Sequence, residues 1–202
     1  MSQKDGTASL HGTDSPDGVA APAAERLQHV LGDAMDPQSA EVRALCRGIR
    51  LEVFVGEQGV PLEEEVDALD EAGSTVHVLA SGAHGAPLGT VRVLQDRDQP
   101  GEVHLGRLAV VRGSRGTGLG ARLVAEAERL ALVGAGVAEV GADGEPTGAT
   151  EVTVVLSAQE QAMDFYARCG YEVVSGETYL DAGIAHQDMA RTVTTPTTPT
   201  TP

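Results

Sequence analysis

The sequence predicts a single α/β (α+β) domain built around a mixed β-sheet. A length of 202 residues suits one ordinary domain with flanking segments. The composition is 41% hydrophobic but only 2% aromatic, so the core must consist mainly of Val, Leu and Ala side chains. Short runs with β-propensity alternate with runs of helical spacing, which is the pattern of a sheet covered by helices.

Both ends of the chain lack the apolar residues that a core requires. Residues 1–23 are largely Gly, Ala, Ser, Asp and Pro, and residues 192–202 contain only Thr, Val and Pro. We therefore expect two disordered ends and a folded domain over residues 24–191. The start of the chain has no apolar h-region, and no window reaches the ~20 apolar residues of a membrane span. These observations predict a cytoplasmic protein.

The first half of the domain predicts a helix followed by a three-stranded meander. Residues 25–31 form a short apolar run that fits either a helix or a strand. Pro37 opens a helical pattern that Gly59 and Pro61 interrupt, and an acidic run follows at 63–70. The helical face carries Val42, Leu45, Ile49 and Val53. The runs 74–80 and 88–94 predict an antiparallel hairpin, and 103–111 predicts the third strand of the meander.

The second half begins with a strand that enters a helix through a glycine-rich turn. The helix starts after Gly118 and ends at Gly134, and a glycine-rich loop is expected at 141–149. Its apolar face carries Leu119, Leu123, Ala127, Leu130 and Val133. A buried strand at 152–156, a helix at 159–169 and two weaker strands at 171–174 and 186–191 complete the domain.

Charge and cysteine content limit the classes of partner. Fourteen basic and thirty acidic residues give a net charge of −16, which opposes binding to nucleic acid or an anionic membrane. The same charge could attract a cationic amine substrate, and it is equally explained by solubility. Cys46 and Cys169 lie far apart and form no C-x-x-C pattern, so we expect neither a metal site nor a disulfide.

The segment Arg112–Gly120 is the strongest chemical signal, because it lies where a strand ends and a helix begins. Gly116, Gly118 and Gly120 stand at alternate positions, which lets the backbone turn tightly and present N–H groups. With the positive end of the helix dipole behind it, such a turn suits a pyrophosphate, and Arg115 can add a charge-assisted contact.

Two common phosphate-binding motifs do not fit this segment, one because of its residues and the other because of its structural context. A Walker loop requires Gly-Lys-Ser/Thr, whereas Gly120 is followed by Ala121 and Arg122. Gly116-x-Gly118-x-x-Ala121 does match the Rossmann fingerprint, with Glu139 about 20 residues further on. The upstream strands form a hairpin meander, however, and not a βαβ unit. A Rossmann-type NAD(P)-dependent oxidoreductase stays open as an alternative.

A third interpretation rests on a resemblance. Arg115-x-x-Gly118-x-Gly120 resembles the R/Q-x-x-G-x-G/A motif of the GNAT N-acetyltransferases, and Ala158-Gln159 with Phe165-Tyr166 and Gly170-Tyr171 resembles their second signature. A further stretch is similar to the small bacterial ElaA-type members: Arg50, Phe54, Glu57-Gln-Gly-Val-Pro61, Glu65-x-Asp67-x-x-Asp70 and Gly183-x-x-His186-x-x-Met189. The likeness covers about residues 40–191. It departs from the family in a longer loop at 141–149 and in Gly113-Ser114.

The resemblance implies a fold, a cosubstrate and a donor site. The implied fold is a mixed sheet of about six to seven strands with about four helices, in which the strand at 103–111 splays away from the next strand of the sheet. The implied cosubstrate is acetyl-CoA, and an N–H near Val110 would polarise its thioester carbonyl. The residues implied to bind it are Leu108, Ala109, Val110, Arg115, Gly116, Thr117, Gly118, Leu119 and Gly120.

The resemblance also implies direct attack by an amine in a ternary complex. Tyr166 corresponds to the family's general acid, although it could simply pack its helix. Asp70 and Glu65 are candidates for the proton-accepting group, and Glu57, Asp67 and His186 for acceptor binding. A solvated acidic loop and packed histidines, including His77, are the structural alternatives.

Function beyond the donor site is left open by the sequence. The acceptor is a small-molecule or peptide amine, and its identity is not encoded in the motifs. A homodimer through the last strands is compatible with the sequence. A regulatory module that binds acyl-CoA without turnover is the alternative from another functional class.

Overall fold

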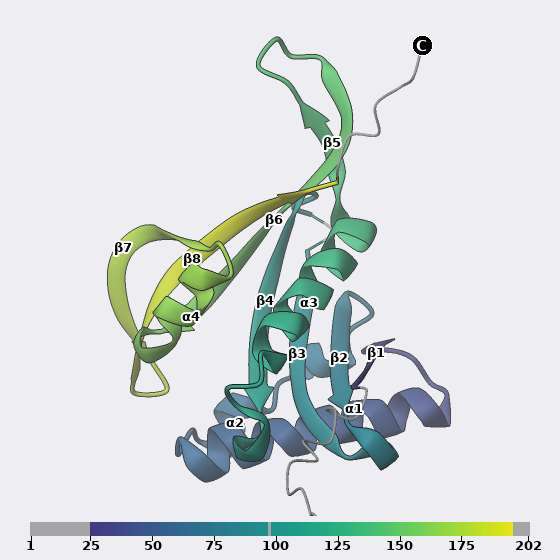
Figure 1. Ribbon diagram of the computed structural model, residues 1–202, viewed down its shortest axis with the longest axis vertical. Coiled ribbons are helices and arrows are strands. Elements are labelled where there is room, and N and C mark those ends of the chain that lie inside the picture. The colour runs from purple at the N-terminus through teal and green to yellow at the C-terminus, as the bar shows by residue number, and fades with distance from the viewer. Residues whose placement is uncertain (1–24, 97, 196–202) are drawn as a thin grey trace, which may run out of the picture.

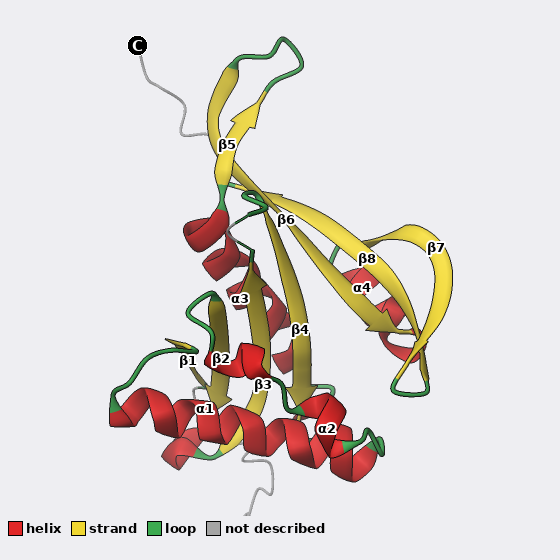
Figure 2. Ribbon diagram, turned by 180° about the vertical axis from the view of Figure 1, so that it is seen from behind, coloured by secondary structure: helices red, strands yellow, loops and turns green. Residues whose placement is uncertain are grey.

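The computed structural model describes residues 25–96 and 98–195 as an eight-stranded mixed sheet covered by helices (Figures 1 and 2). The expectations for residues 1–23 and 196–202 lie outside the described residues. The strands are β1 Arg26–Leu31, β2 Thr75–Ser81, β3 Pro87–Gln95, β4 Glu102–Val110, β5 Val137–Val140, β6 Pro146–Gln159, β7 Glu172–Asp181 and β8 Ile184–Thr194. The α-helices are α1 Pro37–Arg50, α2 Leu62–Glu65, α3 Leu119–Ala135 and α4 Met163–Arg168.

The order of strands in the sheet is β1-β2-β3-β4-β6-β8-β7, with β5 paired to β6. All neighbours are antiparallel except β4 and β6, which run parallel. That parallel pairing covers only three residue pairs, from Glu102–Thr153 to His104–Val155. Beyond it the two strands diverge, as Figure 2 shows, and the predicted antiparallel meander and splayed strands are confirmed.

Helices α1 and α3 cover opposite faces of the sheet (Figures 1 and 2). Side chains alternate along each strand, so the sheet supplies a separate apolar face to each helix. On the α3 side, Leu119, Leu123 and Ala127 belong to the larger buried cluster. On the α1 side, Val42, Cys46, Ile49 and Val53 pack against Leu79 and Ala109.

Local sequence signals explain where α1 begins and how it continues. The Asp36 side chain accepts a hydrogen bond from the Ser39 N–H at 2.9 Å, and Pro37 occupies the first helical turn, where its missing N–H has no cost. After Arg50 the chain widens into a π-helix over Leu51–Glu57. Such π-helical segments are frequent at functional sites, and this one ends at Glu57, which forms an ion pair with Arg115.

The structure corrects several boundaries. The run at 25–31 is a strand, and the predicted loop at 141–149 is mostly a hairpin, because residues 137–140 form β5 and β6 starts at Pro146. The sheet therefore has eight strands, more than expected. The last strand also continues past the expected boundary at residue 191, since Thr192–Thr194 pair with Thr153–Glu151 of β6.

Candidate active site

The divergence of β4 and β6 opens a cavity of about 570 Å³. One wall consists of β4 residues from His104 to Val110 together with part of the π-helix and the segment after it. The opposite wall comes from the end of β6, from α4 and from the β7–β8 turn. The Gln159 side-chain amide donates to Gln58 Oε1 at 2.8 Å and connects the two walls. A ligand in this cavity would therefore contact segments far apart in the sequence.

The glycine loop before α3 presents backbone N–H groups that have no acceptor. Gly116 and Gly118 have φ angles of +78° and +83°, a region that favours glycine. Within the described residues, the N–H groups from Gly116 to Gly118 donate to no protein acceptor. A Cβ at Gly120 would lie 3.3 Å from the Phe165 ring, so this position allows α3 to approach α4. The loop has the geometry of an anion site at a helix N-terminus.

Arg115 lies between the glycine loop and the cavity, and its side chain is engaged twice. Its Nε donates to the Val110 carbonyl at 2.9 Å, and its Nη1 lies 2.9 Å from Glu57 Oε2. Hydrogen bonding from Arg115 is the main cause that lowers the pKa of Glu57. Glu57, expected to bind the acceptor, is thus held by the arginine expected to bind phosphate.

The end of β4 turns a backbone N–H into the cavity. The Val111 N–H donates to the Leu88 carbonyl of β3 at 2.9 Å. Successive N–H groups of a strand point in opposite directions, so the Val110 N–H points away from β3 and toward the cavity between β4 and β6. By the same alternation, the Leu108 N–H lies on the cavity side, while the Ala109 side chain is buried beneath α1.

Tyr166 reaches the cavity from α4 and is 9% exposed. Its ring packs edge-to-face on Phe165 and Tyr171, with centroids 5.0 and 5.8 Å apart. Burial raises the pKa of the Tyr166 phenol above its usual value, which keeps the hydroxyl protonated at neutral pH. A protonated phenol at the cavity wall can donate a proton, as the role predicted for Tyr166 requires.

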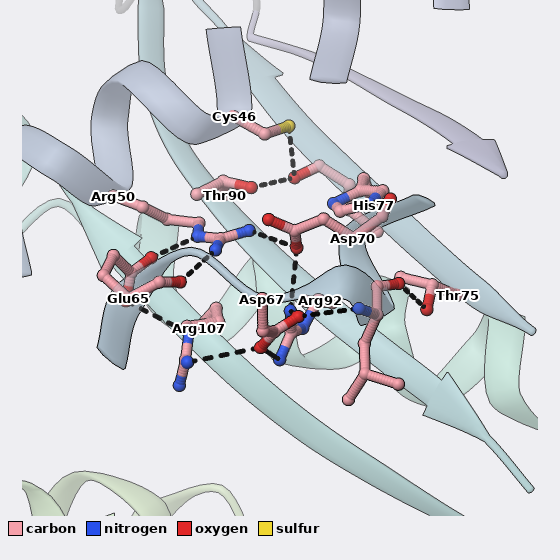
Figure 3. Close-up of polar contacts among 12 residues, drawn as sticks. Cys46, Arg50, Glu65, Asp67, Asp70, Thr75, His77, Thr90, Arg92 and Arg107 are labelled. Atoms are coloured by element: carbon pink, nitrogen blue, oxygen red, sulfur yellow. Dashed lines mark hydrogen bonds and ion pairs between the residues drawn. The ribbon is translucent and has the colours of Figure 1, made fainter. Parts of the chain in front are cut away.

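The acidic residues expected near the acceptor belong to an arginine–carboxylate network, in which Arg50, Arg92 and Arg107 contact Glu65, Asp67 and Asp70 (Figure 3). Asp70 Oδ1 lies 2.7 Å from both Arg50 Nη1 and Arg92 Nη1. Burial would raise the pKa of Asp70, but hydrogen bonds from the two arginines outweigh it and lower the pKa.

This pairing corrects the catalytic roles predicted for Glu65 and Asp70. Both are only 2% exposed and their charges are matched by arginines, so accepting a proton would leave buried arginine charge uncompensated. Asp67 is likewise held by Arg92, at 2.8 and 2.9 Å, and does not line the cavity. Glu65, Asp67 and Asp70 are therefore paired with arginines, whereas Glu63 and Glu64 of the same run are exposed.

The histidines separate into two groups. His77 is buried away from the cavity, and its Nε2 lies 2.8 Å from the Asp70 carbonyl oxygen. His186 does line the cavity, where its Nδ1 hydrogen-bonds the Ile184 carbonyl at 2.8 Å and its ring stacks on Tyr179. The structure thus brings His186, but not His77, to the expected acceptor side.

His104, an accessible β4 side chain that lines the cavity, was not predicted from the sequence. Among the described residues it has no hydrogen-bond partner. The surrounding protein desolvates the imidazole and lowers its pKa, an effect that Arg92 and Arg107 reinforce and that Asp188 and Glu102 oppose. Its buried neighbours Val103 and Leu105 place His104 on the opposite strand face, but alternation alone does not reveal the cavity there.

A second missed group lies across β6, β7 and β8. The Tyr179 hydroxyl lies 2.6 Å from both Asp188 Oδ1 and Ser157 Oγ, and the Ser157 hydroxyl also hydrogen-bonds Asp188 at 3.0 Å. Ser157 lines the cavity beside His186. These residues come from separate strands and show no spacing motif. Of the three, Ser157 places a polar group in the wall of the cavity.

Cysteines and metal ligands show no further chemistry in the described part of the chain. Cys46 is fully buried, and burial raises its pKa to about 11, so it stays a thiol. No group of three or more His, Cys, Asp or Glu side chains in residues 25–96 and 98–195 could hold a metal ion. Across the same residues, none of the helices has the length and apolarity needed to cross a membrane.

Comparison with known proteins finds similarity over most of the chain at the level of sequence. A sequence model of the acetyltransferase (GNAT) domain matches residues 34–193. The uncharacterized N-acetyltransferase YjcF of Bacillus subtilis is 36% identical over 143 residues, which cover 71% of this chain and 87% of that protein.

Two solved structures share the fold over most of the chain. The crystal structure of an acyl-CoA N-acyltransferase from Pseudomonas aeruginosa is 30% identical, with a TM-score of 0.65, and the alignment covers 83% of this chain and 99% of that one. Escherichia coli ElaA has the same fold at 24% identity, with a TM-score of 0.64 over 83% of this chain and 99% of ElaA.

Proposed function

This chain belongs to the GNAT acetyltransferase family, and on that premise we propose that it transfers the acetyl group of acetyl-CoA to the primary amine of a small molecule or peptide. The observation that carries the proposal is the arrangement of three groups around the cavity between β4 and β6. Val110, Arg115 and Tyr166 line the cavity, and the glycine loop with its unpaired N–H groups directly follows Arg115.

The donor would bind along β4 and end at the glycine loop. The pyrophosphate takes the N–H groups of Gly116–Gly120 at the start of α3, where the helix dipole favours an anion. Arg115 can reach the same anion if its side chain leaves Glu57 and the Val110 carbonyl. The pantetheine arm then pairs with the exposed backbone of Leu108 and Val110 in the gap between the strands.

The chemistry requires stabilisation of an oxyanion and two proton movements. The amine nitrogen attacks the thioester carbon, a C–N bond forms, and the negative charge that develops on oxygen is met by the Val110 N–H. The amine loses its proton, relayed by water along the cavity, to the His104 imidazole, which its lowered pKa keeps neutral at physiological pH. Collapse of the intermediate breaks the C–S bond, and the CoA thiolate takes a proton from Tyr166.

His104 replaces Glu65 and Asp70 as the proton acceptor in this proposal. Its side chain is accessible and neutral, whereas the two carboxylates are buried and paired with arginines. The acceptor amine would approach along the wall that carries His186, Ser157 and the exposed Asp181, with the exposed Glu64 on the opposite wall. A carboxylate at such a position attracts a cationic amine and leaves its proton transfer to the imidazole.

Of the two alternatives, the Rossmann oxidoreductase conflicts with the fold, because β1–β4 are antiparallel neighbours and not βαβ units. The non-catalytic acyl-CoA-binding module differs from our proposal only in turnover. The protonated Tyr166 and neutral His104 at one cavity favour an enzyme.

The test combines calorimetry and turnover. Acetyl-CoA, CoA and NADPH are titrated into the wild type and into the Arg115→Ala, Gly118→Asp double variant. Thiol release is then followed with a panel of primary amines. We expect acyl-CoA binding that the double variant loses, and amine-dependent thiol release. Binding without release for any amine would support the regulatory module, and binding of NADPH alone would refute the donor site.

A further inference from the structure

Strand β4 contains a bulge at Arg107. From Arg92 to Thr90, β3 advances by two residues while β4 advances by three, from Gly106 to Ala109. The extra residue changes which backbone groups face β3. Without it, the Ala109 N–H would point into the cavity and the Val110 N–H would pair with β3. The bulge therefore decides which N–H is available to a ligand.

The backbone of Arg107 is in the left-handed region, with φ +56°. Arginine has no intrinsic preference for this region, so surrounding contacts must hold the conformation. Neither a tight turn nor a glycine explains it, because Arg107 lies within a strand. The side chain of Arg107 supplies the contacts.

Arg107 extends from the bulge to the acidic segment around α2. Its Nη2 donates to the Glu64 carbonyl at 2.9 Å and lies 3.5 Å from Asp67 Oδ2. Its Nε lies 3.1 Å from Glu65 Oε2, an ion pair in which the N–H is not aimed well enough for a hydrogen bond. One side chain thus makes three contacts with a segment about 40 residues earlier in the chain.

The acidic segment is itself held rigidly from below. Arg50 of α1 donates to Asp70 Oδ1 at 2.7 Å and to the Glu65 carbonyl at 2.8 Å. Arg92 of β3 binds both oxygens of Asp67 (Figure 3). In the arginine–carboxylate network three positive charges face three negative charges, so each partner has a fixed geometry. The contacts of Arg107 therefore end on a rigid support.

We propose that Arg107 is a positioning residue, whose side chain, held by Glu65, Asp67 and the Glu64 carbonyl, maintains the β4 bulge and so directs the Val110 N–H at the acetyl carbonyl. The inference rests on the proposed function, because it concerns a bound thioester. It gives Glu65 and Asp67 a role that acts through Arg107 and not through contact with the acceptor.

The polarisation of the thioester provides a readout that a merely structural role would not change. An N–H aimed at a carbonyl oxygen weakens the C=O bond and lowers its stretching frequency. We would measure this frequency by infrared difference spectroscopy of ¹³C-carbonyl acetyl-CoA bound to the full chain, in the absence of acceptor. Calorimetry on the same samples gives the dissociation constant for acetyl-CoA. This constant should change little in the variants, because the pyrophosphate site lies on other residues.

We expect the bound carbonyl of the wild type to absorb below that of free acetyl-CoA, and this difference to diminish in Arg107→Ala with little change in affinity. Where an amine substrate is in hand, kcat should fall about 10²-fold with an almost constant KM for acetyl-CoA, the scale of a misplaced oxyanion donor. Asp67→Asn, at a more accessible position, should act in the same direction but less strongly. Arg129→Ala removes an exposed ion pair on α3 and should match the wild type.

Arg107→Gly distinguishes the contribution of the side chain from that of the backbone conformation, since glycine adopts the left-handed region without support. Under our proposal Arg107→Gly therefore recovers at least part of the carbonyl shift that Arg107→Ala loses. A wild-type carbonyl frequency in Arg107→Ala, or an equal loss of the shift in both variants, would overturn the positioning role. If Arg107→Ala does not fold, Asp67→Asn with an unchanged frequency would overturn it as well. Failure of the wild type to bind acetyl-CoA would instead overturn the proposed function itself, and calorimetry detects that outcome first.

Discussion

Replacing His104 with Gln tests the proton acceptor most directly. The ordinary histidine pKa of about 6.5 already leaves about three quarters of the imidazole neutral at pH 7. Desolvation by the surrounding protein and the charges of Arg92 and Arg107 lower the pKa further, against the opposing effect of Asp188 and Glu102. The wild-type enzyme is therefore almost fully competent at neutral pH, and it should lose activity as the pH falls through the lowered pKa and the imidazole gains a proton.

The expected loss in His104→Gln depends on the acceptor. General-base catalysis contributes about 10²–10⁴-fold, so kcat/KM for a strongly basic amine such as ethylamine should fall by about 10² or more. Trifluoroethylamine has a similar size but is mostly neutral at pH 7, and it should be affected far less. Gln keeps a polar side chain of similar length, so the cavity is not emptied.

The assay follows thiol release from acetyl-CoA with both amines between pH 5.5 and 9. His29→Gln, at an exposed β1 position outside the cavity, is the matched control and should behave like the wild type. An equal loss for both amines, or a variant that keeps the acidic limb of the wild-type pH profile, would refute the role of His104.

Three further predictions concern the donor site and the charges. Glu57→Gln should tighten binding of acetyl-CoA about 2–5-fold in calorimetry, because it frees Arg115 from its ion pair with Glu57; weaker binding would show that Glu57 assists the donor. Tyr166→Phe should lower kcat about 10²-fold in the thiol-release assay with little change in KM, and an unchanged kcat would leave only packing for the hydroxyl. The pKa values of Asp67 and Asp70 lie below the ordinary value of 3.8, so their stabilising effect is complete above about pH 4 and is lost as the pH falls through the lowered values. Asp67→Asn should cost about 1–2 kcal/mol in urea unfolding at neutral pH and less in acid, whereas an equal cost at both pH values would contradict the ionic contribution.

The position of the glycine loop in the fold could be predicted because its signal is local. Gly116, Gly118 and Gly120 follow one another at the junction of a strand and a helix, and short-range backbone geometry dictates their use. The structure places them at the start of α3, where their N–H groups are available. Tyr166 could be placed for the same reason, since it lies in a helix identified by its flanking residues.

The acceptor half depends on long-range contacts. Glu65 and Asp70 were predicted to be reactive because the sequence around them shows no positive partner. Their partners Arg50, Arg92 and Arg107 come from three other parts of the chain. His104 is accessible because β4 and β6 separate after their short pairing. The residues next to His104 in the sequence do not reveal that separation.

Errors in the fold have a related cause. The four residues of β5, preceded by Gly136 and followed by Gly141, are too few to show a period-2 pattern. The Thr-rich end of β8 has a disordered composition, yet it becomes ordered because β6 offers a partner strand.

The short parallel pairing of β4 and β6 divides the sheet into two halves that share one hydrophobic core. In the described residues the backbones of the two halves meet at three residue pairs and at the hydrogen bond from the Thr153 N–H to the Gly101 carbonyl. Substitutions in β7 and the β7–β8 turn can therefore reshape one wall while the other keeps its backbone. Under the proposed function, such substitutions would change the acceptor that the protein accepts, while the proposed donor loop at the start of α3 would keep its conformation.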